Sequence, residues 1–171
     1  EFVIHQGDYT SIQEWIKNGM IDFGFLNPAA ASGIKTEEIQ TGKMLVILPE
    51  NHRLSGMEEI PLEKLAKEPF ILLEEGNYSE PLEAFQSAGL KPNIKYTIHD
   101  DYSIMSMVEA GLGISMLAEL VLHRTAYHLA IRSTTPPVYR TISVGYKDKG
   151  TLPVAAKRFI QCLKEHAEQL P

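Results

Sequence analysis

The chain has 171 residues, of which 44% are hydrophobic and 22% charged, and its formal net charge at pH 7 is −6. This length and composition are those of a globular protein with a buried core. The acidic balance argues against a nucleic-acid-binding surface on this chain, because such surfaces need clustered lysine and arginine side chains.

Strands and helices are predicted to alternate along the chain. Residues 2–5 are expected to form a short strand, residues 9–19 a helix that ends at Gly19, and residues 21–26 a buried strand. Further strands are predicted at 43–49, 70–73, 94–99, 114–117, 128–132 and 139–147, and further helices at 61–68, 79–89, 100–111, 118–124 and 153–170. This order predicts an α/β structure with mainly parallel sheets.

Two proline-bearing junctions are candidate crossings between lobes. They lie near residues 48–49 and 133–137, where the second is the rigid connector "STTPP". Residues 1–47 together with 138–171 would then form lobe I, and residues 50–132 lobe II. Ligand sites in open α/β sheets lie beyond the carboxyl ends of strands, often between lobes. A ligand cleft between the two lobes is therefore expected.

The segment "GLG" around Gly111 and Gly113 has two possible interpretations. It lacks the G-x-G-x-x-G spacing of a phosphate-binding loop, and it precedes a strand instead of following one. Gly111 is better explained as the left-handed end of a helix, and Gly113 as a tight entry into the next strand.

The spacing of the residues matches no known pattern of catalytic or metal-binding side chains. The six histidines show no H-E-x-x-H pattern, and no G-x-S-x-G segment is present. Asp100 and Asp101 could be a carboxylate pair, but acids at a helix start are more often caps. Cys162, the single cysteine, is interpreted as a small buried hydrophobic residue. We predict no catalytic residue, no metal and no cofactor, and hence no enzyme.

The sequence also indicates the cellular compartment of the protein. One thiol excludes an internal disulfide and fits a reducing cytoplasm. No apolar run is long enough to cross a bilayer, and the first residues lack the pattern of a signal peptide. A cytoplasmic protein with no membrane partner is expected.

Polar residues follow several of the predicted strands, where an α/β cleft would place them. Each one by itself is best explained as a helix cap or a turn, but as a set they predict a ligand site. Helix starts near Ser79 and Asp101 could hold the oxygens of an anionic ligand, which favours a small carboxylate. The predicted ligand-binding residues are Asp8, Asn27, Asn77, Tyr78, His99, Asp100 and Ser103.

The order of the segments resembles the effector-binding domain of LysR-type transcriptional regulators. "HQGDYTSIQEWIKNGMIDFGFL" is similar to that family's strand-helix-G-x-[IL]-D segment. "MLVILPENHRL" resembles its P-x-x-H-P-L stretch, with Arg53 where proline is usual. "VEAGLGISML" is similar to its V-x-x-G-x-G-[IV] signature, and "RTISVGYKDKGTLPVAAKRFIQCL" resembles the strand and helix that close the first lobe.

The resemblance implies two Rossmann-like lobes joined by two crossover strands, as in type 2 periplasmic binding proteins. It also implies a small-molecule effector between the lobes, no catalysis, a cytoplasmic bacterial regulator that forms a homodimer or homotetramer, and DNA binding through an N-terminal helix-turn-helix domain. That domain, and the family's first strand and first helix, have no counterpart here, so lobe I is expected to be truncated at its N-terminus.

The family's ligand contacts carry over only in part. Asp8 and Asn27 match polar positions that follow two strands of the first lobe. His99, Asp100 and Ser103 fall in the segment before V-x-x-G-x-G that borders the cleft. Asn77 and Tyr78 match a more variable loop.

Two other classes of protein use the same two-lobed architecture. A solute-binding protein would deliver its ligand to a transporter, and its coding sequence would begin with a secretory signal. An enzyme such as a deaminase or dehydratase would need a catalytic group, and a loss of turnover on changing His99 or Asp100 would indicate one.

Overall fold

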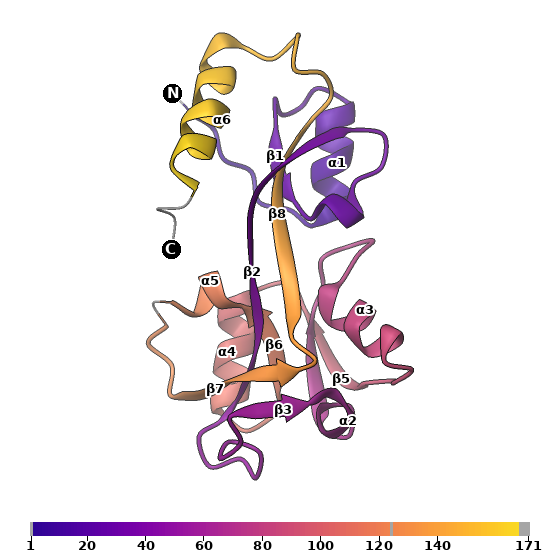
Figure 1. Cartoon of the computed structure of the whole chain (residues 1–171), viewed down its shortest axis with the longest axis vertical. Helices are drawn as coiled ribbons and strands as arrows, with labels where there is room; N and C mark the ends of the chain where they lie inside the picture. Colours follow the sequence, from indigo (N-terminus) through magenta and orange to yellow (C-terminus); the bar gives the residue numbers. More distant parts are fainter. Residues whose placement is uncertain (1, 124, 168–171) are drawn as a thin grey trace. The chain divides into compact units, whose positions relative to one another are not determined.

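The computed structural model describes residues 2–123 and 125–167, and the chain divides into two compact units (Figure 1). Unit 1 consists of Glu1–Thr41, Glu75–Tyr78 and Thr141–Pro171, and unit 2 of Gly42–Glu74 and Ser79–Arg140. Strands β2 (Lys35–Pro49) and β8 (Val138–Tyr146) each continue from one unit into the other. The lobe boundaries expected from the sequence stay a prediction.

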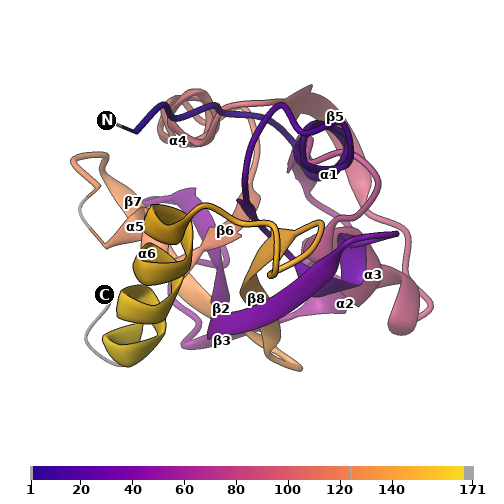
Figure 2. The same ribbon diagram turned by 90° about the horizontal axis from the view of Figure 1, so that it is seen from above.

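Unit 1 packs helices against a short antiparallel strand pair. In β1 (Gly24–Leu26), Leu26 lies opposite Ser143 of β8. One core cluster joins β8 to α6 (Val154–Glu165) through Val144, Tyr146, Leu152, Ala156 and Ile160. A second cluster joins α1 (Tyr9–Lys17), which Figure 2 shows almost end-on, to β1 and the short 3₁₀ helix η1 (Pro28–Ala30) through Tyr9, Leu26 and Ala30.

A group of ionised side chains joins β2 to the C-terminal part of unit 1. Lys149 Nζ and Lys164 Nζ donate to the Glu37 carboxylate at 2.7 Å and 2.6 Å, and the Tyr146 hydroxyl donates to it as well. These three donors lower the pKa of Glu37 from its ordinary value of 4.5 to about 2. The folded state therefore stabilises the ionised carboxylate of Glu37 relative to the unfolded state.

The Glu37 group predicts a loss of stability in acid. Because the pKa of Glu37 is lower in the folded state, its contribution is present above pH 4.5 and is lost as the pH falls toward about 2. Both lysines are substantially exposed, so the contribution is expected to be about 1 kcal/mol. Chemical unfolding measured across this range should show a shallower acid loss for Glu37→Gln than for the wild type. A matched Glu38→Gln variant should keep the wild-type slope, and equal slopes for all three proteins would contradict the prediction.

Unit 2 contains the larger core. Its elements, besides parts of β2 and β8, are β3 (Glu59–Pro61), α2 (Leu62–Leu65), β4 (Pro69–Leu73), α3 (Glu80–Ser87), β5 (Asn93–Ile98), α4 (Asp101–Glu109), β6 (Ser115–Ala118), α5 (Glu119–Leu122) and β7 (Leu129–Thr135). Strand β2 pairs antiparallel with β6 and β7, while β7 pairs parallel with β3, and β4 with β5. Phe70 and Phe85, both fully buried, meet edge-on in the main cluster.

The prediction of mainly parallel sheets is wrong, although the α/β class is confirmed. Alternating strands and helices give parallel sheets only when neighbouring strands belong to one βαβ unit. Here β2 passes from unit 1 into unit 2 and runs antiparallel to β6 and β7 there. The six-stranded sheet is consequently mixed, and only the pair of β4 and β5 forms a wholly parallel sheet among the described residues.

Two predictions for extended segments are also wrong. Residues 2–5 form no strand, and the side chains of Phe2, Val3 and Ile4 are exposed, because no strand pairs with this segment within residues 2–123 and 125–167. A strand depends on hydrogen bonds to a neighbour. Residues 133–135 belong to β7 and not to a connector, so only Pro136 and Pro137 separate β7 from β8.

Cys162 is exposed, contrary to the prediction. The buried residues of α6 are Ala156 and Ile160, spaced four apart, so Cys162 lies two positions beyond that stripe and faces outward. Both glycine predictions are confirmed. Gly111 ends α4 with φ +78°, and a Cβ on Gly113 would lie 2.6 Å from the carbonyl oxygen of Pro69.

None of the helices that the structure describes is long and apolar enough to span a membrane.

Candidate functional site

The predicted site residues of unit 1 gather around the first turn of α1. Asp8 caps the helix, and its Oδ1 accepts a hydrogen bond from the backbone N–H of Ser11 at 2.7 Å. This is the geometry of a helix cap, which satisfies an otherwise unpaired N–H. Asp8 is predicted as a polar residue that follows the strand expected at residues 2–5, and the structure makes it a helix cap that is partly exposed.

Segment 75–78 lies against the same helix turn. The N–H of Tyr9 donates to the Glu75 carbonyl at 3.0 Å, and the N–H of Asn77 donates to Thr10 Oγ1 at 3.0 Å. Gly76 has φ +84°, and a Cβ there would lie 2.5 Å from Thr10 Oγ1. Only glycine fits this close approach.

Asn27, Asn77 and Tyr78 extend the cluster to η1. Asn27 is 5% exposed and caps η1 by accepting the N–H of Ala29 at 2.8 Å. Asn77 Nδ2 donates to the Ala30 carbonyl at 3.1 Å, and Tyr78 packs on the cluster that contains Ala30. The structure therefore brings all four predicted residues of unit 1 to neighbouring positions.

Sequence reasoning missed Ser143, which lies on β8 opposite Leu26, the residue before Asn27. Its side chain is 1% exposed, and its hydroxyl has no hydrogen-bond partner among the described residues. Buried hydroxyls are nearly always paired, so an unpaired one marks a place where a ligand or water could bind. Nothing in the alternating pattern of β8 distinguishes this serine from a packing residue.

The predicted residues of unit 2 lie at the start of α4. Asp100 caps this helix, since its Oδ2 accepts the N–H of Ser103 at 2.7 Å. The side-chain and backbone donors of Ser103, followed by the backbone of Tyr102, lower the pKa of Asp100. His99 and Ser103 are exposed beside the cap. The interpretation of Asp100 as a cap is confirmed.

Asp101 and a buried ion pair lie close by. Arg140 donates through Nε and Nη2 to the Glu80 carboxylate at 3.0 Å and 3.1 Å, and Glu80 is 3% exposed. Burial raises the pKa of Asp101, and the charge of Arg140 opposes this shift. Asp101 Oδ1 is buried without a hydrogen-bond partner in the described chain. No pattern in the sequence indicates the Glu80–Arg140 pair, whose residues lie 60 positions apart.

The site groups of both units are mostly hydrogen-bond acceptors. The side-chain oxygens of Asp8, Asn27 and Asp100 each accept a hydrogen bond from a backbone N–H at a helix start. Within residues 2–123 and 125–167 no three His, Cys, Asp or Glu side chains lie where they could hold a metal ion. Each of the two helix starts, taken by itself, presents acceptors that suit a polar group that donates hydrogen bonds.

The family model described as LysR substrate binding domain matches residues 1–168. The chain belongs to this family. A relative of this LysR domain, the HTH-type transcriptional regulator YvbU of Bacillus subtilis (strain 168), is 30% identical over 96% of the chain. The match covers 57% of YvbU, so the chain spans little more than half the length of that curated relative.

Solved structures establish the fold of the LysR domain. The regulatory domain of Synechocystis PCC6803 CcmR, in complex with 2-PG, is 21% identical with a TM-score of 0.82, covering 96% of this chain and 82% of that one. The effector-binding domain of QuiR, in complex with shikimate, is 21% identical with a TM-score of 0.85, covering 98% of this chain and 82% of that one. The type 2 periplasmic-binding-protein-like fold with two lobes is confirmed.

Proposed function

We propose that this chain is the effector-sensing part of a LysR-type transcriptional regulator that binds DNA through a helix-turn-helix domain outside residues 1–171. The family match over residues 1–168 carries the proposal. The relatives are named as transcriptional regulators, which favours this function over a solute-binding protein. A cytoplasmic homodimer or homotetramer without catalytic activity completes the proposal.

The effector is proposed to contact Asp8, Asn27, Asn77 and Tyr78 in unit 1, and His99, Asp100 and Ser103 in unit 2. Carboxylates at the starts of α1 and α4 would repel a ligand that is only an anion. Hydroxyl groups on the ligand would instead donate to these acceptors. We therefore favour a small hydroxylated metabolite, and the carboxylate group predicted from the sequence would bind away from the two aspartates.

The effector can regulate DNA binding simply by binding more tightly to one assembly state of the regulator than to another. An effector with different affinities for two states shifts their populations by that difference, and no chemical step is required. Because DNA contact would belong to another domain, the net charge of −6 on this chain is compatible with the proposal.

Ser103→Ala is expected to weaken effector binding about tenfold, which corresponds to one lost hydrogen bond. The variant keeps the cap hydrogen bond from the backbone N–H of residue 103 to the Asp100 carboxylate, and it loses the hydrogen bond that the Ser103 hydroxyl makes to the same carboxylate. A thermal-shift screen with shikimate and other small hydroxy acids identifies a ligand, and calorimetry then measures its affinity.

Ser106→Ala is the matched control for that variant, since Ser106 is an exposed serine one turn further along α4. Its affinity should equal that of the wild type. Equal affinities for all three proteins would remove Ser103 from the site, and a turnover of the ligand would contradict the proposal that the chain has no catalytic activity.

A further inference from the structure

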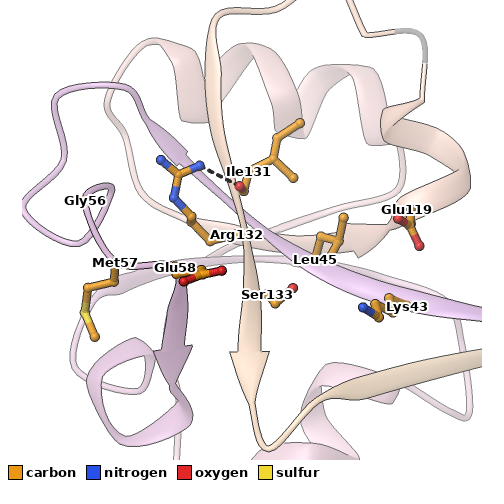
Figure 3. A pocket seen from close by; sticks show the side chains of 9 residues that line it. All are labelled: Lys43, Leu45, Gly56, Met57, Glu58, Glu119, Ile131, Arg132 and Ser133. Carbon is orange, nitrogen blue, oxygen red and sulfur yellow. Dashed lines mark hydrogen bonds between the residues drawn. The ribbon is translucent and has the colours of Figure 1, made fainter.

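Unit 2 has a surface hollow that none of the proposed effector residues lines. It has a volume of about 450 Å³ and lies between β2, β7, the segment before β3 and the start of α5 (Figure 3). Sites for small molecules have volumes of about 300–1,000 Å³, so the hollow can hold a small metabolite. Leu45 and Ile131 give it an apolar wall.

Four charged side chains surround this hollow. Lys43 and Arg132 are positive, and Glu58 and Glu119 are negative. The side chains of Lys43, Glu58 and Glu119 are exposed and have no ion-pair or hydrogen-bond partner in the part of the chain that the structure describes. Figure 3 shows Arg132 and Glu58 on one side of the hollow and Glu119 on the other.

Arg132 is held in place by backbone groups. Its Nε donates to the Ser55 carbonyl at 2.8 Å and its Nη1 to the Ile131 carbonyl at 2.7 Å. Its Nη2 has no partner among the described residues, and a guanidinium presents N–H groups in a fixed planar fork. A carboxylate of a ligand could therefore bind without reordering this side chain.

The charges select the class of ligand. A dianion would gain attraction from the two cations but be repelled by the two carboxylates, and a dication would meet the reverse. A molecule that carries one negative and one positive charge on different atoms can place its negative charge near the two cations and its positive charge near the two carboxylates. We propose that this hollow is a second ligand site, for a small zwitterion of the α-amino acid class.

The adjoining surface indicates which side chain that amino acid carries. A second hollow of about 230 Å³ shares Lys43, Leu45 and Ser133 with the first. Its other lining residues are apolar or aromatic, namely Met44, Pro137, Val138 and Tyr139, except for Glu59 and Thr134. Burial of apolar surface stabilises a bound apolar side chain. The proposed amino acid therefore has an apolar side chain, which would lie against Leu45, Pro137 and Tyr139.

L-Leucine and L-phenylalanine are the probes for this site, titrated separately into the 171-residue chain. At least one is expected to bind, with shifts of the backbone amide resonances of Leu45, Ile131 and Ser133. N-acetylation of the probe removes its cation and amidation removes its anion, and each change is expected to weaken binding about tenfold. Lys43→Met and Glu119→Gln are each expected to weaken it to the same extent.

Lys95→Met, which removes an exposed lysine of β5, is the control and should leave the affinity unchanged. Three outcomes overturn the proposal: neither probe binds, binding survives both Lys43→Met and Glu119→Gln, or the shifted resonances are those of residues 99–103. The last outcome would place the amino acid in the effector site and leave the proposed function standing.

Discussion

Replacing Arg140 with methionine is expected to lower the free energy of unfolding by about 3–5 kcal/mol. The change leaves the buried carboxylate of Glu80 without the two hydrogen bonds, at 3.0 Å and 3.1 Å, that neutralise it. It also removes the positive charge of Arg140, which lowers the pKa of Asp101 against the effect of burial. Urea unfolding of the two proteins at neutral pH measures the difference.

The double variant Arg140→Met with Glu80→Leu tests the reason for that loss. If an unpaired buried charge is the cause, the double variant should regain most of the lost stability, because an apolar pair of similar volume needs no partner. Lys35→Met breaks an exposed ion pair with Asp148 and should cost at most about 1 kcal/mol. An Arg140→Met variant as stable as Lys35→Met would contradict the account of this pair.

Phe85→Ala is expected to lower the free energy of unfolding by about 3–5 kcal/mol. The Phe85 side chain is fully buried, and its ring meets that of Phe70 edge-on with centroids 5.6 Å apart. Alanine removes this contact and leaves a cavity between α3 and β4, which the surrounding side chains fill only in part. Urea unfolding again provides the measurement.

Two variants calibrate the Phe85 result. Phe85→Leu keeps most of the apolar volume and should cost clearly less than Phe85→Ala. Gln86→Ala changes the adjacent exposed position of the same helix and should have almost no effect. A loss below about 1 kcal/mol for Phe85→Ala would mean that α3 does not anchor the core of unit 2.

Local signals in the sequence predicted much of the fold. Helix α4 illustrates this, since Asp100 caps it and Gly111 ends it, as their residue types indicate. The pairing partners of β2 did not follow from such signals, because they depend on its passage from one unit into the other. Strand β3 has three residues, too few for any periodic pattern.

The candidate site was predicted as residue types at strand ends, without its geometry. Asn77 and Thr10 are 67 positions apart in sequence, and only the folded chain joins them. The Glu80–Arg140 pair spans 60 positions, and a glutamate in the first turn of a helix usually indicates favourable interaction with the helix dipole. Contacts of this range leave no trace in one sequence.

The central claim, that the chain senses a small molecule for a DNA-binding regulator, is tested most directly by operator binding of the longer protein. Its affinity for DNA from its own promoter region should be measured with and without each ligand found by the thermal-shift screen. We expect at least one ligand to change that affinity about fivefold or more, a coupling of about 1 kcal/mol, and Ser103→Ala to require a higher ligand concentration for the same change. Specific DNA binding that no ligand alters would contradict the claim.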